Sequence, residues 1–275
     1  MAATRDEHAE SEISEPSIAV LRAPRVYLVG TQTVHDEALD AFLADHEVDR
    51  WTTDAEEAGA KLVEVAGRLC YMSFAKPRPG GNSAYLGHIL EVGHGSVLEH
   101  AVYNFIITGV SRSFTHELIR HRAGFGYSQL SQRFVDESSC AFVEPAAIAE
   151  DPALHEIWLE SMRAAQTAYQ ALANGLASKF KHIEDRTLRR KKAREAARSV
   201  LPNATETKIF VTANARALRH FIEMRGDAAA DVEIRTVALE ILKIMQSVSP
   251  GLFGDYTVVD LPEGGQASAT PHRKV

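Results

Sequence analysis

Cysteine is scarce in this 275-residue chain, and no apolar run is long enough to suggest a membrane-spanning helix. The two cysteines, Cys70 and Cys140, form no CxxC pair and no Cys/His spacing typical of zinc, so neither a disulfide framework nor a metal site is expected. Cys70 ends an apolar helical pattern and is predicted to be a core residue. Without a signal-peptide pattern, the chain is expected to be cytoplasmic.

Motifs that identify several large enzyme classes are also missing. The sequence has no GxGxxG or Walker loop, which excludes the Rossmann and P-loop manners of holding a nucleotide. It has no GxSxG elbow, and neither cysteine lies beside a base, so covalent catalysis has no strong nucleophile. The net charge of −7 argues against a surface that binds nucleic acid all over. Any anion site must therefore be local.

Composition and patterning indicate one domain between two tails. The chain is 45% hydrophobic and 24% charged, which is enough to bury a substantial core. Residues 1–24 are acidic and aperiodic, and residues 262–275 resemble them, so both are predicted to be mobile tails around a domain at 25–261. Helical patterns dominate and the strand patterns follow no regular alternation, which favours an α+β fold over repeating βαβ units.

Periodicity and capping residues place the elements. Thr53-x-x-Glu56 is read as a capping box, and Asp151 followed by Pro152 is read as the start of a long helix. Strands are expected at 25–29 and 101–110, and helices at 58–69, 83–92, 152–180, 206–224 and 229–248. The apolar faces are expected to carry Ala58, Leu62, Val65, Ala66 and Leu69 in the first helix, and Leu154, Ile157, Trp158, Met162, Ala165, Tyr169, Leu172, Leu176 and Phe180 in the long one.

A cluster of anion-binding side chains lies at residues 120–133, RHRAGFGYSQLSQR. It combines three arginines and a histidine with hydroxyls and amides around Gly124 and Gly126, which allow the backbone to approach a ligand closely. Guanidinium groups match phosphate oxygens two at a time. The cluster therefore predicts a phosphate site, with a solvated basic turn as the alternative.

Two other segments carry polar side chains at suggestive spacings. HGSVLEH at 94–100 holds two histidines and a carboxylate, but the spacing is not HExxH. Hydrogen bonding to a cofactor is favoured there over metal binding, with a polar helix cap as the alternative. Arginines recur every four residues from Arg186 to Arg198, which suits a phosphate or a polynucleotide, although such a stripe is usually a solvated face. Arg198 lies nearest a structural break and is the member expected to reach a site.

The segment 214–225, NARALRHFIEMR, poses a geometrical problem. On one continuous helix Asn214 and Arg225 would share a stripe, whereas Arg216 and His220 would lie on the opposite one. Either the helix starts after Arg216, or the two faces serve different ligands or different subunits.

Together these segments resemble the flavin-dependent thymidylate synthases. That family's hallmark is R-H-R, seven residues, then S-x-R, and this chain has Arg120-His121-Arg122, eight residues, then Ser131 and Arg133. HGSVLEH, AARSVLPNATET at 196–207 and NARALRHFIEMR follow in the family's order, so the resemblance spans most of 50–250. The extra residue is expected to form a bulge at Gly124 and Gly126. Ala229 stands where many members have a flavin-contacting histidine.

The resemblance implies an enzyme and its partners. The expected fold is a helix-rich α+β domain with a central, mostly antiparallel sheet, assembled into a cytoplasmic homotetramer that shares its active sites. The implied reaction is reductive methylation of dUMP to dTMP, with 5,10-methylenetetrahydrofolate as carbon donor and NADPH as reductant acting through FAD. The resemblance implies no metal and no enzyme nucleophile.

The resemblance also assigns residues. Arg225 would activate the uracil ring, and His94 and Lys191 are candidates for folate or NADPH. The predicted dUMP contacts are Glu117, Leu118, Ile119, Arg120, Gln129, Leu130, Ser131, Gln132, Arg133, Arg198 and Arg225. The predicted FAD contacts are Ser96, Arg120, His121, Arg122, Gln129, Asn214, Arg216 and His220. A polyanion-binding module built on the arginine stripe, and a flavoprotein without methyl transfer, are the alternatives.

Overall fold

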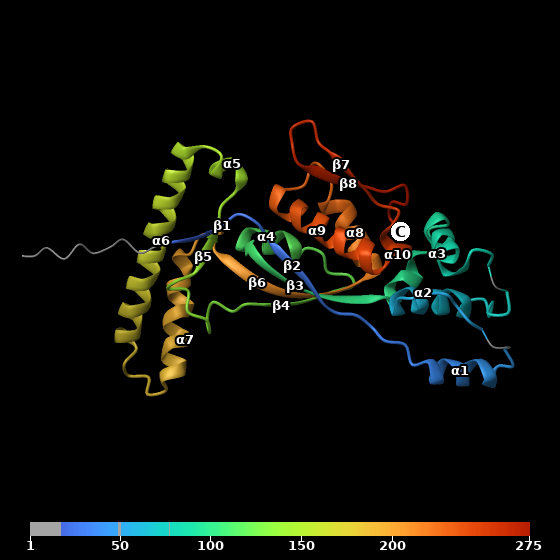
Figure 1. Ribbon diagram of the computed structural model, residues 1–275. Helices are drawn as coiled ribbons and strands as arrows, with labels where there is room; N and C mark the ends of the chain where they lie inside the picture. Colours follow the sequence, from blue (N-terminus) through green and yellow to red (C-terminus); the bar gives the residue numbers. More distant parts are fainter. Residues whose placement is uncertain (1–17, 49–50, 77) are drawn as a thin grey trace, which may run out of the picture.

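A four-stranded antiparallel sheet lies at the centre of the molecule (Figure 1). The computed structural model describes residues 18–48, 51–76 and 78–275. The strand order is β2 (Arg25–Gly30), β3 (Val102–Ser111), β6 (Glu206–Asn214) and β4 (Phe125–Gln129), and each neighbouring pair is antiparallel. This arrangement confirms the expected α+β class with an antiparallel sheet.

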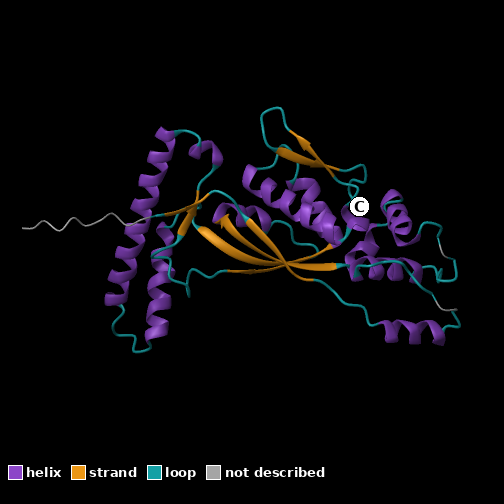
Figure 2. Cartoon of the chain, in the orientation of Figure 1, coloured by secondary structure: helices purple, strands orange, loops and turns teal. Residues whose placement is uncertain are grey.

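The two central strands bury one face by an alternation that holds along most of their length. Phe105 of β3 is paired with Val211 of β6, and both lie in the main core. Helices α8 (Ala215–Arg225) and α9 (Val232–Val248) contribute to that core and lie along one side of the sheet (Figure 2). The opposite face leaves Tyr27 and Phe210 exposed.

Strand β6 corrects the sequence prediction of a helix over 206–224. The first nine residues of that range form β6, and α8 begins only at Ala215. Thr207, Ile209 and Val211 are β-branched residues two positions apart, and all three are buried. That period of two fits a half-buried strand better than a helix. The change of structure lies at Asn214, whose side chain caps α8 by accepting a hydrogen bond from Ala217 N.

Helix α2 (Ala58–Leu69) turns a different face inward from the one predicted. Its N-cap is Glu57, which accepts hydrogen bonds from Gly59 N and Ala60 N, so the expected capping box at Thr53 is wrong. The buried face carries a Glu64–Arg68 ion pair, which places the predicted apolar face toward partly exposed positions. Leu69 is exposed, and so is Cys70, which was predicted to lie in the core.

The remaining elements of this end are α1 (Asp36–Asp45), α3 (Gly81–Glu91), the 3-10 helix η1 (Gly95–His100) and α10 (Pro250–Phe253).

Two long helices form an arm at the other end of the sheet (Figure 1). Helix α6 (Pro152–Lys179) starts at the predicted Asp151 cap and packs against α7 (Arg186–Ala197), which continues into η2 (Arg198–Val200). Of the predicted apolar stripe, Leu154, Ile157 and Leu172 are exposed. Among the helices that the structure describes, none is long and apolar enough to cross a membrane. Strand β1 (Ala19–Leu21) pairs in parallel with β5 (Ala141–Val143), and α5 (Ala146–Ala149) precedes α6.

Both predicted tails have to be revised where they are described. Residues 262–275 are ordered: β8 (Gln266–Ala269) pairs with β7 (Thr257–Asp260), and Val275 belongs to the main core. The C-terminal segment packs through side chains distant in sequence, which local patterning does not register. At the other terminus, the prediction for residues 1–17 lies outside the described residues, and residues 19–21 form β1.

Candidate functional site

Arg225 is fixed by two partners that come from the segment around the R-H-R motif. Its Nη1 donates to Glu117 Oε2 at 2.7 Å, and its Nε donates to His121 Nε2 at 3.0 Å. Glu117 lies on the short helix α4 (Arg112–Leu118), and His121 follows directly after that helix. Arg225, the last residue of α8, therefore presents its guanidinium in a single orientation, with one edge held by the carboxylate and the imidazole.

His121 is held in its neutral form. Burial, together with the charges of Arg225 and His220, lowers the pKa of His121 to about 4. The neutral ring can accept the Arg225 hydrogen bond, whereas a protonated ring could not. Tyr127 fixes the backbone between Leu118 and His121, because its hydroxyl donates to Leu118 O and His121 O. The Tyr127 pKa is raised by burial, so the hydroxyl keeps its proton.

A cavity of about 450 Å³ lies beside this cluster, and we call it the α8 pocket. His220 links the two, since its ring centroid is 5.9 Å from that of His121. The side-chain oxygen of Asn214 caps α8. The side-chain NH₂ group of Asn214 is therefore the part that could donate to a ligand in the pocket. Arg216 Nη1 contacts Glu99 Oε1 at 2.6 Å. The lining residues are Glu99, Ala123, Gly124, Asn214, Arg216, Ala217, His220, Lys274 and Val275.

The geometrical problem of segment 214–225 is thereby resolved within one chain. Because α8 begins at Ala215, Asn214 is its N-cap and is not held to the helical stripe that the sequence predicted. Arg216 and His220 lie one turn apart on α8, and all three residues line the pocket. Arg225 lies at the other end of α8 and faces α4 instead. The predicted flavin residues of this segment therefore share a pocket, and the predicted catalytic residue lies outside it.

The extra residue of the R-H-R motif is absorbed by a turn. Phe125 N donates to Arg122 O, and Gly124 adopts a left-handed conformation with φ +73°. A Cβ added to Gly124 would lie 2.7 Å from Asn214 Nδ2 and 2.8 Å from Ala217 Cβ. Gly126 lies in the strand β4 and has no such restriction, so the predicted glycine pair reduces to one required glycine.

A second cavity, of about 340 Å³, lies at the opposite end of β4, and we call it the α4 pocket. Gln132 and Arg198, both predicted dUMP contacts, line it together with His116. Ser131 precedes Gln132, and its Oγ accepts from Arg133 N at 3.4 Å. The lining residues are Arg112, His116, Gln132, Glu195, Arg198, Ser199, Leu201, Pro202 and Asn203.

Arg112 is a site residue that the sequence reasoning missed. Arg112 and Arg198 line the same pocket, and burial together with the charge of Arg198 lowers the pKa of the Arg112 guanidinium, although Glu137 opposes this shift. Arg133 is paired with Glu195, while its Nε is buried without a hydrogen-bond partner. Two guanidiniums in one pocket favour an anion. Arg133 itself lines the small cavity that Lys191 also lines. The sequence feature that could have identified Arg112 is its position directly after the buried strand β3.

Several predicted dUMP residues have structural contacts within the chain. Gln129 Nε2 donates to the hydroxyls of Thr115 and Thr207, which ties β4 to α4 and β6. Leu118 is buried in the core, and Leu130 N donates to Lys208 O. Ile119 and Arg120, and the predicted FAD contact Arg122, are exposed and line neither pocket.

The remaining predicted residues are dispersed. His94 stacks loosely near Tyr71, and Ser96 is exposed on η1, one turn before Glu99. Lys191 lies over the Phe134 ring at 4.8 Å, beside a small cavity that Arg133 also lines.

The arginine stripe of α7 does not form one continuous face for a polyanion. Arg194 is paired with Asp136 and also donates to Phe134 O. Arg186 and Arg190 line a cavity near the α6–α7 turn, and Arg190 also lines a small cavity with Arg194. Arg198 lies apart from these three, in the α4 pocket.

Comparison with known proteins agrees with the motif. Residues 53–251 match the sequence model of a family described as thymidylate synthase complementing protein. The chain is 52% identical over 232 residues to a flavin-dependent thymidylate synthase of Mycobacterium tuberculosis strain H37Rv, covering 84% of this chain and 92% of that protein. A flavin-dependent thymidylate synthase of Mycobacteroides abscessus is 50% identical with the same coverage.

Solved structures support the same fold. A UMP/dUMP methylase PolB from Streptomyces cacaoi, bound with 5-Br UMP, superimposes with a TM-score of 0.62 at 21% identity, over 87% of this chain and 96% of that one. The form bound with 5-Br dUMP gives a TM-score of 0.63 at 20% identity, over 86% and 96% of the two chains. The family match covers most of the chain and its relatives align over nearly their whole length, so this chain belongs to the flavin-dependent thymidylate synthase family.

Proposed function

We propose that this enzyme converts dUMP to dTMP, with 5,10-methylenetetrahydrofolate as carbon donor and NADPH as the source of electrons for a bound FAD. The observation that carries the proposal is Arg225, whose guanidinium Glu117 and His121 hold in one orientation. His220 connects this cluster to the α8 pocket, and α4 connects it to the α4 pocket through His116. A fixed guanidinium beside two anion sites suits a reaction between two phosphorylated ligands.

The α8 pocket suits the flavin dinucleotide. Arg216 and His220 can neutralise a pyrophosphate, and the Asn214 amide offers further donors. Gly124 gives the backbone a close approach that a side chain at this position would block. Arg120, Arg122 and Ser96 are exposed near this region, and we propose that they contact FAD where subunits meet.

The α4 pocket suits the phosphate of dUMP. Arg112 and Arg198 both line it, and an anion between them would remove their mutual repulsion. The motif residues Ser131, Gln132 and Arg133 are adjacent and can complete the phosphate's hydrogen bonds. We assign Ser131 to binding, because a serine nucleophile requires an adjacent general base.

Arg225 would activate the uracil. Carbon 5 of uracil is a weak nucleophile, and without a cysteine addition the ring must be polarised directly. A guanidinium beside the ring's oxygen edge stabilises the enolate-like charge that develops as carbon 5 attacks the methylene group. A reduced flavin held by Arg216 and His220 would supply the hydride that completes the methyl group. Glu117 and His121 keep the guanidinium oriented through this step.

The two pockets must be supplied by different subunits to meet. They lie at opposite ends of β4, and the stretch from Gly124 to Leu130 corresponds to roughly 20 Å of extended chain. Hydride transfer requires contact at roughly 3–3.5 Å between flavin and uracil. We therefore propose a homotetramer in which one subunit's α8 pocket adjoins a neighbour's α4 pocket.

One experiment tests the function. Purified protein should carry a yellow flavin and form dTMP from dUMP only when NADPH and methylenetetrahydrofolate are both present. Product formation without added folate, or its absence from protein fully loaded with FAD, would contradict the proposal. In the second case, tight FAD binding without methyl transfer would identify an altered flavoprotein.

A further inference from the structure

The C-terminal segment reaches the α8 pocket from outside the matched family region. The match ends at residue 251, yet Lys274 and Val275 line the pocket together with Arg216 and His220. Gly95 shows how closely this segment packs, since a Cβ added there would lie 2.9 Å from the Val275 carbonyl carbon. The last residues of the chain are therefore part of the pocket wall.

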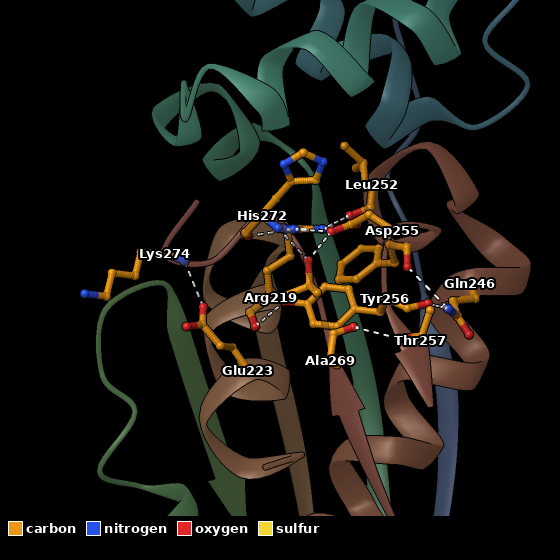
Figure 3. A network of polar contacts seen from close by, with 12 residues as sticks. Arg219, Glu223, Gln246, Leu252, Asp255, Tyr256, Thr257, Ala269, His272 and Lys274 are labelled. Atoms are coloured by element: carbon orange, nitrogen blue, oxygen red, sulfur yellow. Dashed lines mark hydrogen bonds and ion pairs between the residues drawn. The ribbon is translucent and has the colours of Figure 1, made fainter. Parts of the chain in front are cut away.

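A buried ion pair anchors this segment (Figure 3). Arg219 is 1% exposed, and its two terminal nitrogens contact the two carboxylate oxygens of Asp255 at 2.6 and 2.8 Å. Arg219 also donates to His272 O, and Thr270 donates to Asp255. Although burial opposes it, Arg219 holds the pKa of Asp255 below its usual value, so the pair stays charged. One arginine thus joins α8 to the chain on both sides of the β7–β8 hairpin.

Glu223 fixes the final residues one turn further along α8. It accepts hydrogen bonds from Lys274 N at 2.9 Å and from Arg273 Nε at 3.0 Å. These contacts lower the pKa of Glu223 in spite of its burial. Lys274 adopts φ +63°, a left-handed conformation that a lysine keeps where its surroundings fix it. Figure 3 shows its side chain extending away from Glu223.

The charges around the pocket indicate what this lysine can bind. Glu99, the acidic residue of the lining, is already paired with Arg216. Arg273 is used by Glu223, whereas Glu223 holds Lys274 through the backbone and leaves its ammonium for a ligand. The lining therefore includes an exposed ammonium whose backbone is held in place by Glu223, which suits an anionic ligand.

We infer that Lys274 is a further flavin-binding residue, which contacts the phosphates of the dinucleotide in the pocket that Arg216 also lines. This inference rests on the proposed assignment of the α8 pocket to FAD. Arg219, Asp255 and Glu223 are positioning residues, because they act by holding the segment that carries Lys274.

Flavin titration of the apoprotein tests this role. Binding of FAD and of riboflavin, which lacks phosphate, is measured by the change in flavin fluorescence for the wild type, Lys274→Gln and Lys243→Gln. Lys243 is an exposed lysine of α9 and serves as the matched control. We expect Lys274→Gln to weaken FAD binding about two- to fivefold, as for an exposed ion pair, and to leave riboflavin binding unchanged. Lys274→Glu should weaken FAD binding further.

Two results would overturn the inference. One is unchanged FAD affinity in both Lys274 variants, and the other is an equal loss for FAD and riboflavin, which would indicate damage to the fold. Arg216→Gln separates this inference from the proposed function. If Arg216→Gln weakens FAD binding and the Lys274 variants do not, the inference alone fails, whereas unchanged binding in all of them removes the flavin from this pocket.

Discussion

His121 illustrates how a single residue acquires a role from its surroundings. Its ordinary pKa of 6.5 is lowered to about 4 by burial and by the neighbouring Arg225 and His220 charges. The folded protein therefore resists a proton that the unfolded chain binds below pH 6.5. The contribution of His121 to the free energy of unfolding is therefore fully present above pH 6.5 and is lost as the pH falls toward 4.

This shift gives a prediction for the pH dependence of stability. We expect the free energy of unfolding to fall between about pH 6.5 and 4, and to fall less in His121→Gln, which cannot be protonated. Urea unfolding across this range measures the difference. An NMR titration of His121 should give a midpoint of about 4, and a midpoint near 6.5 would contradict the argument.

Arg225 should matter for turnover far more than for flavin binding. Its partners Glu117 and His121 lie outside the α8 pocket, so Arg225→Ala should leave FAD bound while it removes the charge that we propose polarises uracil. Loss of one such stabilising donor costs roughly 10²–10³ in kcat. Flavin absorbance and steady-state turnover of the same preparation test both expectations. Turnover within a few fold of the wild type would refute the activating role.

At the scale of single residues, the sequence predicted which residues belong to the candidate site better than it predicted which residues they contact. The R-H-R motif and Arg225 were found because each belongs to a short pattern. The bonds from Glu117 and His121 to Arg225 were not found, because these residues are more than a hundred positions away in the chain. Arg112 was missed for the same reason, since its significance depends on Arg198 lining the same pocket.

At the scale of elements, the turn before β4 forms part of the wall of the α8 pocket. Gly124 closes the turn in a left-handed conformation, and its hydrogen atoms face Asn214 and Ala217. Because Gly126 follows in ordinary strand geometry, the two glycines offer a matched pair of substitutions.

Gly124→Ala should be destabilising and Gly126→Ala should be tolerated. The left-handed conformation alone costs an alanine about 1–2 kcal/mol, and the added Cβ would also overlap the pocket wall. At Gly126 the added Cβ would make an ordinary contact of 3.7 Å with Thr212, so a change within about 0.5 kcal/mol is expected. Thermal unfolding and FAD titration of the two variants provide the comparison. Similar behaviour of both would show that the turn tolerates a side chain.

Element prediction succeeded where one pattern extends over a whole element. The start of α6 at Asp151 and Pro152 is correct because the cap and the first turn are local features. Residues 206–224 were assigned to one helix because the apolar residues of β6 run directly into those of α8. The boundary is set by pairing of β6 with β3 and β4, which a single strand does not reveal.

At the scale of the whole molecule, one chain leaves surfaces that a partner could cover. Tyr27 and Phe210 are exposed on the sheet face away from α8, and Ile157 is exposed on α6. Exposed apolar residues of this kind are consistent with association, although a scattered few are normal in a monomer. The separation of the two pockets along β4 is the stronger argument, since a flavin in one pocket and a uracil in the other, as we propose, would not be in contact within one chain of this conformation.

Complementation between two inactive variants tests that argument. Arg225→Ala disables the side of the site next to the α8 pocket, and Arg198→Glu disables the α4 pocket. If each active site takes these residues from different subunits, co-expression should restore intact sites, about a quarter of the total for random assembly of equal amounts. Turnover of the purified mixture, with each variant alone as the control, measures the fraction. A mixture as inactive as its parents would place Arg225 and Arg198 of one site on the same chain, so that the two pockets would have to meet by movement within that chain.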